Sequence, residues 1–546
     1  ARLARLLEAG RQEDGRLSPA FVVEFLQWLR DQPSSAAPAW QALQEALVAQ
    51  GDSPDEMLRL EHQREAADQL AIGNIITSMR LLSSIDWTLF FERVSLVEHV
   101  LRGDPAGAYG LMDFPTRDRY RHSVEQLARR AGLAETAVAR RAIALAREAA
   151  DSAPDHDRPH HVGYYLISRG RFRLEQDLAY RPRVREVLAR FAFRHQALGY
   201  LGTLAAGTGL GVASLLLYAD RHGASPAGLV IAALLVLLPV SELVISLVNL
   251  LVTAQVPPRP LPKLAMLEGI PPGHRTMVVV PVIVDSEPRL AALFDDLEVR
   301  YLGNRDPQLH FALLSDFADA AEASREEDAA LLAAAARRVE ELNERHGPDR
   351  FYFFHRERRW NPGEGRWMGW ERKRGKLAEF NRLLRGASDT SFVVCHGDLS
   401  VLPAIRYVIT LDSDTQLPLD AARSLVGTLS HPLNRPRFDP VLQRVTEGYG
   451  VLQPRIGVNV VSGNRTAFAK VFSGHVGVDP YTTAVSDVYQ DLFGEGSFTG
   501  KGIYDVDAFE RATHGRFPEN TLLSHDLIEG SYARAGLATD IEVFDD

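Results

Sequence analysis

Two long segments with almost no charged residues limit most strongly the folds that this chain can adopt. Gln196 to Tyr218 contains no charged side chain and is long enough to cross a bilayer as a helix. Ala227 to Val256 is interrupted only by a few polar side chains and one charge, Glu242. Uncharged stretches of this length are rare in soluble domains, where the alternative is a helical hairpin buried in a core. We therefore predict two transmembrane helices with a short loop at residues 191–256.

The charges beside these segments predict their orientation. Five arginines precede the first segment within a short stretch, and Arg259 and Lys263 follow the second. Because cytoplasmic flanks carry the excess of Lys and Arg, we expect both flanks in the cytoplasm and the loop on the outer side. Glu242 lies near the middle of the second segment, so we expect it to face another helix or a polar channel rather than lipid.

Composition narrows the classes of function. The 546 residues carry a net charge of −10, which argues against a protein that holds nucleic acid through its phosphates. The single cysteine, Cys395, excludes a disulfide framework and a cysteine-based zinc site. The sequence begins without methionine and ends abruptly, so we expect it to be a piece of a longer protein.

Apolar residues at helical spacing predict helices in residues 1–190, which we assign to an N-terminal cytoplasmic helical domain. Within it, Val124 to Ala142 resembles a DNA-binding helix-turn-helix, with Gly132 at the turn. We favour an ordinary helical hairpin, because the second helix offers few side chains that suit the edges of bases.

Beyond a proline-rich stretch, residues 257–546 alternate between strand and helix patterns. Met277 to Val284 is rich in valine, as expected of a parallel strand that is covered on both faces. Further strands are predicted at 310–314, 351–354 and 407–411, and helices at 290–302, 324–345 and 376–384. This alternation predicts an α/β domain built on a parallel sheet.

The strand at 407–411 is followed by two aspartates, Asp412 and Asp414. Open α/β sheets bind ligands at the carboxyl ends of their strands, and no cation beside the pair neutralises it. Two carboxylates on one turn suit a divalent metal, Mg²⁺ or Mn²⁺, with phosphate oxygens completing the coordination shell. A solvated turn is the alternative interpretation.

Three further segments carry candidate binding residues. Asp316 ends a strand and suits a ribose or a uracil N–H, although it also suits the N-cap of the next helix. Lys373-Arg374-Gly375-Lys376 opens a helix, where backbone N–H groups and a lysine would bind a diphosphate unless the cluster is a solvated basic face. Gly494 to Gly502, which includes Lys501, lacks the phosphate-loop pattern. We expect its glycines to let the backbone approach a bulky substrate.

The segment Ser524-His525-Asp526-Leu527-Ile528-Glu529 begins another predicted helix. A buried Asp526 with a raised pKa would serve as general base for an acceptor hydroxyl, with His525 and Glu529 as alternatives of the same kind. A helix N-cap is the other interpretation. The remaining candidates for substrate binding are Gln453, Arg455 and Glu529. Three tryptophans would either stack on a sugar ring or pack in a core: Trp360, Trp367 and Trp370.

In this order the motifs resemble those of inverting, processive glycosyltransferases of the cellulose synthase type, which have a GT-A (Rossmann-like) fold. The matching positions are Asp316 for the nucleotide, Lys376 for the lysine motif, Asp412 with Asp414 for the metal, and Asp526 for the catalytic base. Ser-His-Asp departs from the Thr-Glu-Asp of that group and looks like the variant in periplasmic glucan synthases. The Arg-Trp motif that such enzymes use for acceptor and diphosphate should lie downstream.

A closer resemblance is to the cyclic β-1,2-glucan synthases, and it runs from about residue 75 to the end of the chain. It rests on the phrases MDFPTRDRYRH (112–122), HVGYYLI (161–167), EVRYLGN (298–304), MGWERKRGKLAEFN (368–381), YVITLDSDTQLP (407–418), GSFTGKGIYDVDAF (496–509) and LLSHDLIEG (522–530). The resemblance implies transfer of glucose from UDP-glucose to a growing β-1,2-glucan. It also implies a multi-pass protein of the bacterial inner membrane, with a cytoplasmic glycosyltransferase domain and no nucleic-acid partner.

The resemblance further implies a glucan acceptor linked to the protein, for which a tyrosine is a candidate. The tyrosines considered are Tyr109, Tyr120, Tyr164, Tyr165 and Tyr352.

Three alternatives to this function stay open. One is a haloacid-dehalogenase-type phosphatase, although it requires Thr or Val where this chain has Gln416. The others are a synthase of another periplasmic β-glucan and a membrane-tethered sugar-nucleotide-binding module without a complete catalytic site, which would have little use for Asp526.

Overall fold

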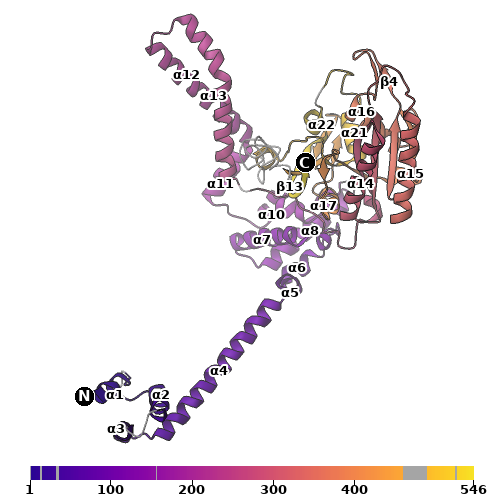
Figure 1. Ribbon diagram of the computed structural model, residues 1–546. Coiled ribbons are helices and arrows are strands. Elements are labelled where there is room, and N and C mark those ends of the chain that lie inside the picture. The colour runs from indigo at the N-terminus through magenta and orange to yellow at the C-terminus, as the bar shows by residue number, and fades with distance from the viewer. Residues whose placement is uncertain are drawn as a thin grey trace. The chain divides into compact units, whose positions relative to one another are not determined.

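The computed structural model of the chain describes residues 2–12, 15–31, 36–154, 156–256, 258–458, 488–522 and 525–545 (Figure 1). The chain divides into two compact units, Ala1–Ser95 and Leu96–Asp546, and each is described by itself. The domain boundary near residue 190 stays a prediction.

Helices form the first unit. They are α1 (Arg2–Ala9), α2 (Pro19–Arg30), α3 (Ala37–Gln50), α4 (Pro54–Ser84) and α5 (Trp87–Val94). Val22, Leu43 and Met57, one from each of α2, α3 and α4, pack in one small core. The start of α4 follows from local sequence, because Ser53 caps it by accepting a backbone N–H and Pro54 occupies its first turn.

The second unit begins with further helices. They are α6 (Leu96–Leu101), α7 (Phe114–Ala131), α8 (Glu135–Ser152), α9 (Gly163–Ile167), α10 (Arg171–Asp177) and α11 (Val184–Arg194). The helical hairpin predicted at 124–142 is confirmed, and Gly132 ends α7 in the left-handed region at φ +68°. Buried polar contacts tie α7 to the start of α9, since Tyr120 Oη lies 3.0 Å from His161 Nε2 and His161 Nδ1 lies 2.7 Å from Asp104.

The two segments that lack charge are helices, α12 (Gln196–Arg221) and α13 (Pro226–Gln255). Both are long and apolar enough to cross a membrane. They approach each other closely where α12 has glycine: a Cβ on Gly207 would lie 2.8 Å from Val244, and one on Gly211 would lie 2.7 Å from Val240. Small residues at such contacts are typical of helix pairs in membranes.

Among the described residues, nine strands form one sheet in the order β6-β3-β2-β1-β7-β12-β11-β13-β8. They are β1 (Thr276–Val284), β2 (Leu309–Phe317), β3 (Phe351–Arg356), β6 (Phe392–His396), β7 (Tyr407–Thr410), β8 (Thr415–Gln416), β11 (Val451–Val458), β12 (Gly502–Asp505) and β13 (Ala535–Asp545). β1 is parallel to β2 and β7, and β2 is parallel to β3. β12 is antiparallel to β7 and β11, so β11 and its parallel partner β13 run the same way as β7. The predicted α/β domain with a largely parallel sheet is thus confirmed.

Helices cover the sheet, and two short ribbons lie beside it. The helices are α14 (Glu287–Gly303), α15 (Asp328–His346), α16 (Arg372–Leu384), α17 (Ala421–Leu429), α20 (Val488–Phe493), α21 (Val506–Thr513) and α22 (Asp526–Ala533). The ribbons are β4 (Arg359–Asn361) with β5 (Arg366–Met368), and β9 (Arg437–Asp439) with β10 (Arg444–Glu447). The helix predicted at 324–345 therefore begins four residues later, at Asp328, and the strand predicted at 407–411 ends at Thr410.

Alternate side chains of β1 enter two different cores. Val278 and Val280 belong to the core that includes α14, α15 and the helices α7 and α8. Met277 and Val279 belong to the core that includes α16 and α21. Both faces of β1 are therefore covered, which is why its sequence is almost continuously apolar.

Phe294 on α14 tests this packing, because its side chain is fully buried against the sheet. We expect Phe294→Ala to reduce the free energy of unfolding by about 3–5 kcal/mol, since it removes an aromatic ring from a closed core. The matched control is Val299→Ala on the same helix, where the side chain is 67% exposed and the expected change is below about 0.5 kcal/mol. Chemical denaturation of the purified protein measures both, and equal losses would contradict the assignment.

Candidate active site

Polar side chains from several strands meet at one edge of the sheet. Asp316 lies near the carboxyl end of β2, Asp412 follows β7, and Asp545 ends β13. Because β12 is antiparallel to β7, its first residues come to the same edge, and Lys501 directly precedes them. β1 has β2 on one side and β7 on the other, so the strand order reverses between β1 and β7. Ligands of open α/β sheets bind at such a point.

Asp316 is the centre of a buried set of ion pairs. Its two carboxylate oxygens each lie 2.8 Å from a nitrogen of Arg356, and Lys376 Nζ lies 3.0 Å away. Burial alone would raise the pKa of Asp316, but Lys376 and Arg356 hold it below its usual value. The helix that follows begins only at Asp328, so the N-cap interpretation of Asp316 is wrong.

Lys376 lies in this buried set rather than free at a helix terminus. Only 2% of the residue is exposed, and Nζ donates to the carbonyl of Val282 at 2.6 Å as well as pairing with Asp316. Burial lowers the pKa of Lys376 to about 8. Arg356, which the sequence analysis missed, carries the second positive charge here; a charged residue at the end of the apolar strand 351–354 was the available signal.

A cavity of about 450 Å³ opens beside these ion pairs. Its lining includes Asp285, Asp316, Asp319, Lys373, Lys376 and Ser413. We call it the donor cavity. Gly369 is required at its wall, because a Cβ there would lie 2.4 Å from Asp316 Oδ2.

Asp412 is held by two lysines from distant parts of the chain. Lys373 Nζ lies 2.5 Å from Asp412 Oδ1, and Lys501 Nζ lies 3.4 Å from Oδ2. Lys501 also pairs with Asp545. The expectation that no cation neutralises the aspartate pair is therefore wrong. Of these partners, Lys373 belongs to the basic motif noted in the sequence, whereas nothing in the sequence pointed to Asp545.

The chemistry of this turn fits a hard divalent cation. Asp412 is half-buried and Asp414 is exposed, so both carboxylates offer oxygen ligands toward solvent. Burial would lower the pKa of Lys501, but Asp545, Asp412 and Asp414 raise it. Asp412 and Asp414 are the residues that would hold Mg²⁺ or Mn²⁺, and Lys373 and Lys501 already pair with Asp412.

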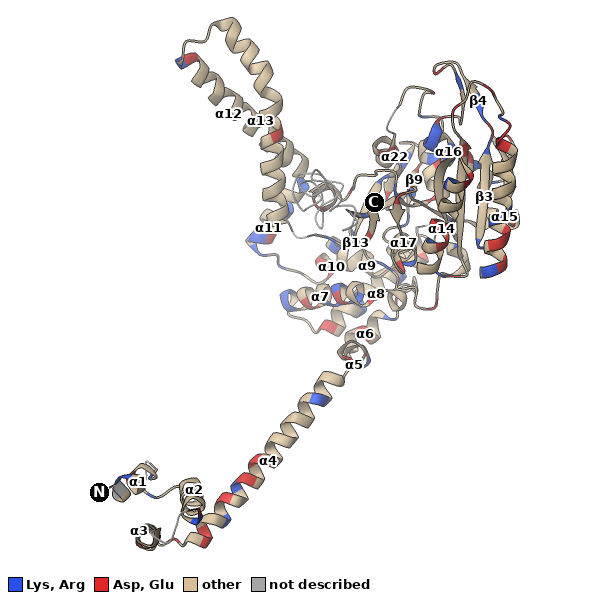
Figure 2. Cartoon of the chain, viewed as in Figure 1, with Lys and Arg blue, Asp and Glu red and all other residues tan. Residues whose placement is uncertain are grey.

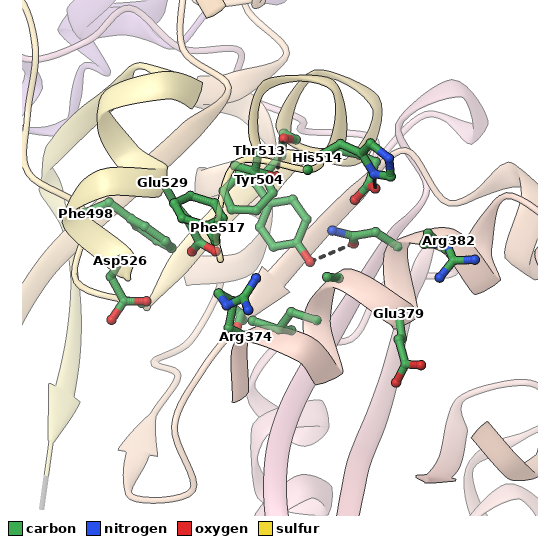
Figure 3. A pocket seen from close by; sticks show the side chains of 18 of the residues that line it. Arg374, Glu379, Arg382, Phe498, Tyr504, Thr513, His514, Phe517, Asp526 and Glu529 are labelled. Atoms are coloured by element: carbon green, nitrogen blue, oxygen red, sulfur yellow. Dashed lines mark hydrogen bonds and ion pairs between the residues drawn. The ribbon is translucent and has the colours of Figure 1, made fainter. Parts of the chain in front are cut away.

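A second cavity, of about 270 Å³, contains the predicted base (Figure 3). Its lining includes Trp370, Arg374, Phe498, Gly500, Phe517, Asp526 and Glu529. We call it the acceptor cavity. The Arg374 guanidinium lies over the rings of Trp370 and Phe517, at 5.8 and 5.5 Å from their centroids. Arg374 thus lies with aromatic rings in this cavity rather than in the donor cavity.

Asp526 is the first residue of α22 and lies beside two other titratable groups. His525 Nδ1 lies 2.9 Å from Glu529 and 3.5 Å from Asp526, and the three residues form a cluster with metal-ligating atoms within 4.8 Å of one another. Burial raises the pKa of Asp526; His525 and Lys373 oppose this, while Glu529 and Asp412 reinforce it. A raised pKa is what a general base requires. The N-cap position belongs to His525, and Ser524 lies outside the described residues.

Gly500 connects the two cavities. It has φ +85°, and a Cβ on it would lie 2.8 Å from Asp526 Oδ1. Its carbonyl accepts a hydrogen bond from Lys373 at 3.0 Å. The glycine-rich segment therefore approaches the predicted base itself, in addition to any approach to substrate.

The remaining candidates lie farther from the cavities. Gln453 and Arg455 are on β11, outside the described lining of either cavity. Gln453 accepts the backbone N–H of Thr499 at 3.0 Å and so holds the glycine-rich segment. Of the tyrosine candidates, Tyr164 is half-buried, and four are buried: Tyr109, Tyr120, Tyr165 and Tyr352.

The apolar helix pair contacts the segment that leads to Gly500. Tyr200 of α12, Val248 of α13 and Val488 of α20 form a small apolar cluster, and the rings of Tyr200 and Phe493 lie 6.0 Å apart. Residue 494, the first glycine of the glycine-rich segment, follows α20 directly. The candidate membrane helices are therefore in contact with α20, the helix that directly precedes the glycine-rich segment.

Gly500→Ala tests the close approach to Asp526. We expect turnover to fall about 10²-fold, because the added methyl group must displace the Asp526 carboxylate. Gly386→Ala is the matched control: Gly386 has φ +82° and no atom within 4 Å of its Cβ position, so it carries the same backbone strain without the clash. The measurement is the steady-state rate of each variant at equal amounts of folded protein. Equal losses of rate in both variants would contradict the role of this contact.

Comparison with known proteins agrees with the resemblance seen in the sequence. No family model matches the chain. The chain is 41% identical over 536 residues to the cyclic beta-(1,2)-glucan synthase NdvB of Rhizobium meliloti (strain 1021), an alignment that includes 96% of this chain. The chain spans 19% of the length of that protein. Along nearly its whole length, the chain is therefore homologous to a region of a cyclic β-1,2-glucan synthase.

Proposed function

We propose that this chain contains the glycosyltransferase region of a cyclic β-1,2-glucan synthase, which transfers glucose from UDP-glucose to a growing glucan with inversion. Homology to a glucan synthase supports the class of reaction. The observation that carries the proposal is a pair of cavities, one lined by Asp316 and Lys373 and the other by Gly500 and Asp526, with a hydrogen bond from Lys373 to Gly500 linking the two linings. The α/β domain would then be a GT-A fold.

The donor cavity suits a sugar nucleotide. Asp316 accepts three charged contacts, and a carboxylate has about four lone-pair sites, so one site remains for a ribose hydroxyl or a uracil N–H. Lys373 and Lys501 supply positive charge where the diphosphate would lie. A divalent metal held by Asp412 and Asp414 would supply Lewis-acid stabilisation of the departing UDP.

The acceptor cavity suits a sugar hydroxyl. The 2-hydroxyl of the terminal glucose attacks C1 of the donor from the face opposite UDP, and its proton goes to Asp526. One displacement converts an α-linked donor to a β-linked product, so a single base is sufficient. The rings of Trp370 and Phe517, with Arg374 over them, offer apolar surface to a pyranose.

The same proposal places α12 and α13 in the bacterial inner membrane, with the α/β domain in the cytoplasm. Their length, composition and exposed apolar side chains support it. If synthesis begins on the protein, Tyr164 is the most accessible of the five tyrosines considered. The 2-linkage rests on homology, and a synthase of another β-glucan linkage would use the same site.

The proposal is tested by incubating membranes that contain the full-length protein with UDP-glucose and Mg²⁺ or Mn²⁺. We expect a β-1,2-linked glucan, identified by linkage analysis, and loss of synthesis when the metal is chelated. Asp526→Asn should reduce turnover about 10²–10⁴-fold, because it removes the general base. The control is Asp507→Asn, an exposed carboxylate on α21. Turnover of Asp526→Asn within a few-fold of the parent would refute the assignment, and hydrolysis of phosphate esters without glucan would favour a phosphatase.

The pH dependence of turnover gives a second test. Asp526 must be ionised to accept a proton, and its pKa is raised above the usual carboxyl value, so activity should fall as the pH falls through that raised pKa. Glu529 contributes to the raised pKa by its negative charge. Glu529→Gln should therefore move the acidic limb of the kcat profile to lower pH, whereas Glu344→Gln on α15 should leave it in place. A shift to higher pH would exclude Asp526 as the group that titrates.

A further inference from the structure

Helix α11 exposes an apolar stripe. Val184, Val187, Leu188 and Phe191 recur at the spacing of one helix face, and they are 76%, 49%, 63% and 65% exposed. No residue of α11 is buried by the described part of the chain. A continuous apolar face of this kind marks a surface that another apolar phase covers.

The opposite side of α11 is attached to the rest of the second unit. Arg190 pairs with both oxygens of Glu175 at 2.7 and 2.8 Å, and Glu186 accepts a hydrogen bond from Tyr180 at 2.8 Å. Glu186 also lies 3.6 Å from Arg130 on α7. These contacts fix the rotation of the helix, so the apolar stripe stays turned away from the unit.

The position of α11 indicates what covers the stripe. α12, which is long and apolar enough to cross a membrane, begins at Gln196, two residues after α11 ends. If α12 enters a bilayer, α11 must lie at the bilayer surface. An amphipathic helix at that depth places its apolar face among the acyl chains and its polar face among the headgroups.

The positive charge around α11 indicates that the lipid is anionic. Residues 181–194 contain five arginines and one glutamate (Figure 2). A hollow of about 490 Å³ on the neighbouring surface adds to this charge, and its lining is His122, Glu125, Gln126, Arg129, Arg130 and Arg183. Arginines at a membrane surface bind the phosphates of anionic lipids.

We propose that α11 lies flat in the headgroup layer of an anionic bilayer. Its stripe of Val184, Val187, Leu188 and Phe191 inserts between acyl chains. Lipid phosphates are bound by the arginines of this stretch other than Arg190, which are Arg181, Arg183, Arg185 and Arg194. This proposal rests on the membrane insertion of α12 and α13. It adds a lipid-binding surface on α11, a helix outside the two candidate membrane spans.

Spin labels test the proposal in the full-length protein, in a background in which Cys395 and every cysteine outside this sequence are replaced by Ser. We would label Leu188→Cys on the stripe, Arg185→Cys on the polar side and Leu210→Cys within α12, in nanodiscs of phosphatidylglycerol. Collisions with oxygen should exceed those with a water-soluble nickel chelate at positions 188 and 210, and the reverse should hold at 185. A label at 188 that meets water, or is shielded from both reagents, would overturn the proposal. A water-exposed label at 210 would overturn the membrane insertion itself.

The lipid charge is tested with the same label at position 188. The ratio of oxygen to nickel collisions should be higher in phosphatidylglycerol than in phosphatidylcholine discs. Replacing Arg183 and Arg185 by Gln should reduce that difference, while Arg444→Gln, an exposed arginine on β10, should preserve it. Equal ratios in the two lipids for the labelled parent would show that anionic headgroups are not recognised.

Discussion

The donor side of the site depends on one buried guanidinium, that of Arg356. It pairs with Asp316 at the end of β2, and it donates to the backbone carbonyls of Trp370 and Arg372 at 2.9 and 3.1 Å. Those carbonyls lie just before Lys373 in the chain. By holding them, Arg356 helps to position Lys373 beside Asp412. Removing one partner of a buried pair of this kind costs about 3–5 kcal/mol, because the other charge is left uncompensated.

One hydrogen bond links the linings of the two cavities. Lys373 lines the donor cavity and donates to the carbonyl of Gly500, and Gly500 in turn touches Asp526 in the acceptor cavity. Lys373 lowers the pKa of Asp526 and Asp412 raises it, so a change of charge at either residue changes the pKa of Asp526. Under the proposed function, binding of a sugar nucleotide beside Lys373 would therefore change the pKa of the base.

The sequence predicts those parts of the site that depend on local pattern. The apolar strand before Asp412 places that residue at the sheet edge, and the glycines near residue 500 predict a close backbone approach. Which lysine of α16 reaches Asp412 depends on tertiary packing instead. Lys373 and Lys376 are one turn apart, and only the packing of α16 on β1 buries Lys376 beside Asp316 and leaves Lys373 at the cavity. Arg356 and Asp545 were missed for the same reason, because their partners lie far along the chain.

The buried ion pairs also constrain how such a chain can change over generations. Asp316, Glu379, Arg356 and Lys376 are each at most 5% exposed and comprise two carboxylates and two cations. Losing any one of them leaves a buried partner charge uncompensated, so the exchange of a neutral pair is less costly than the loss of a single member. We therefore expect natural variation at the four positions to be correlated rather than independent.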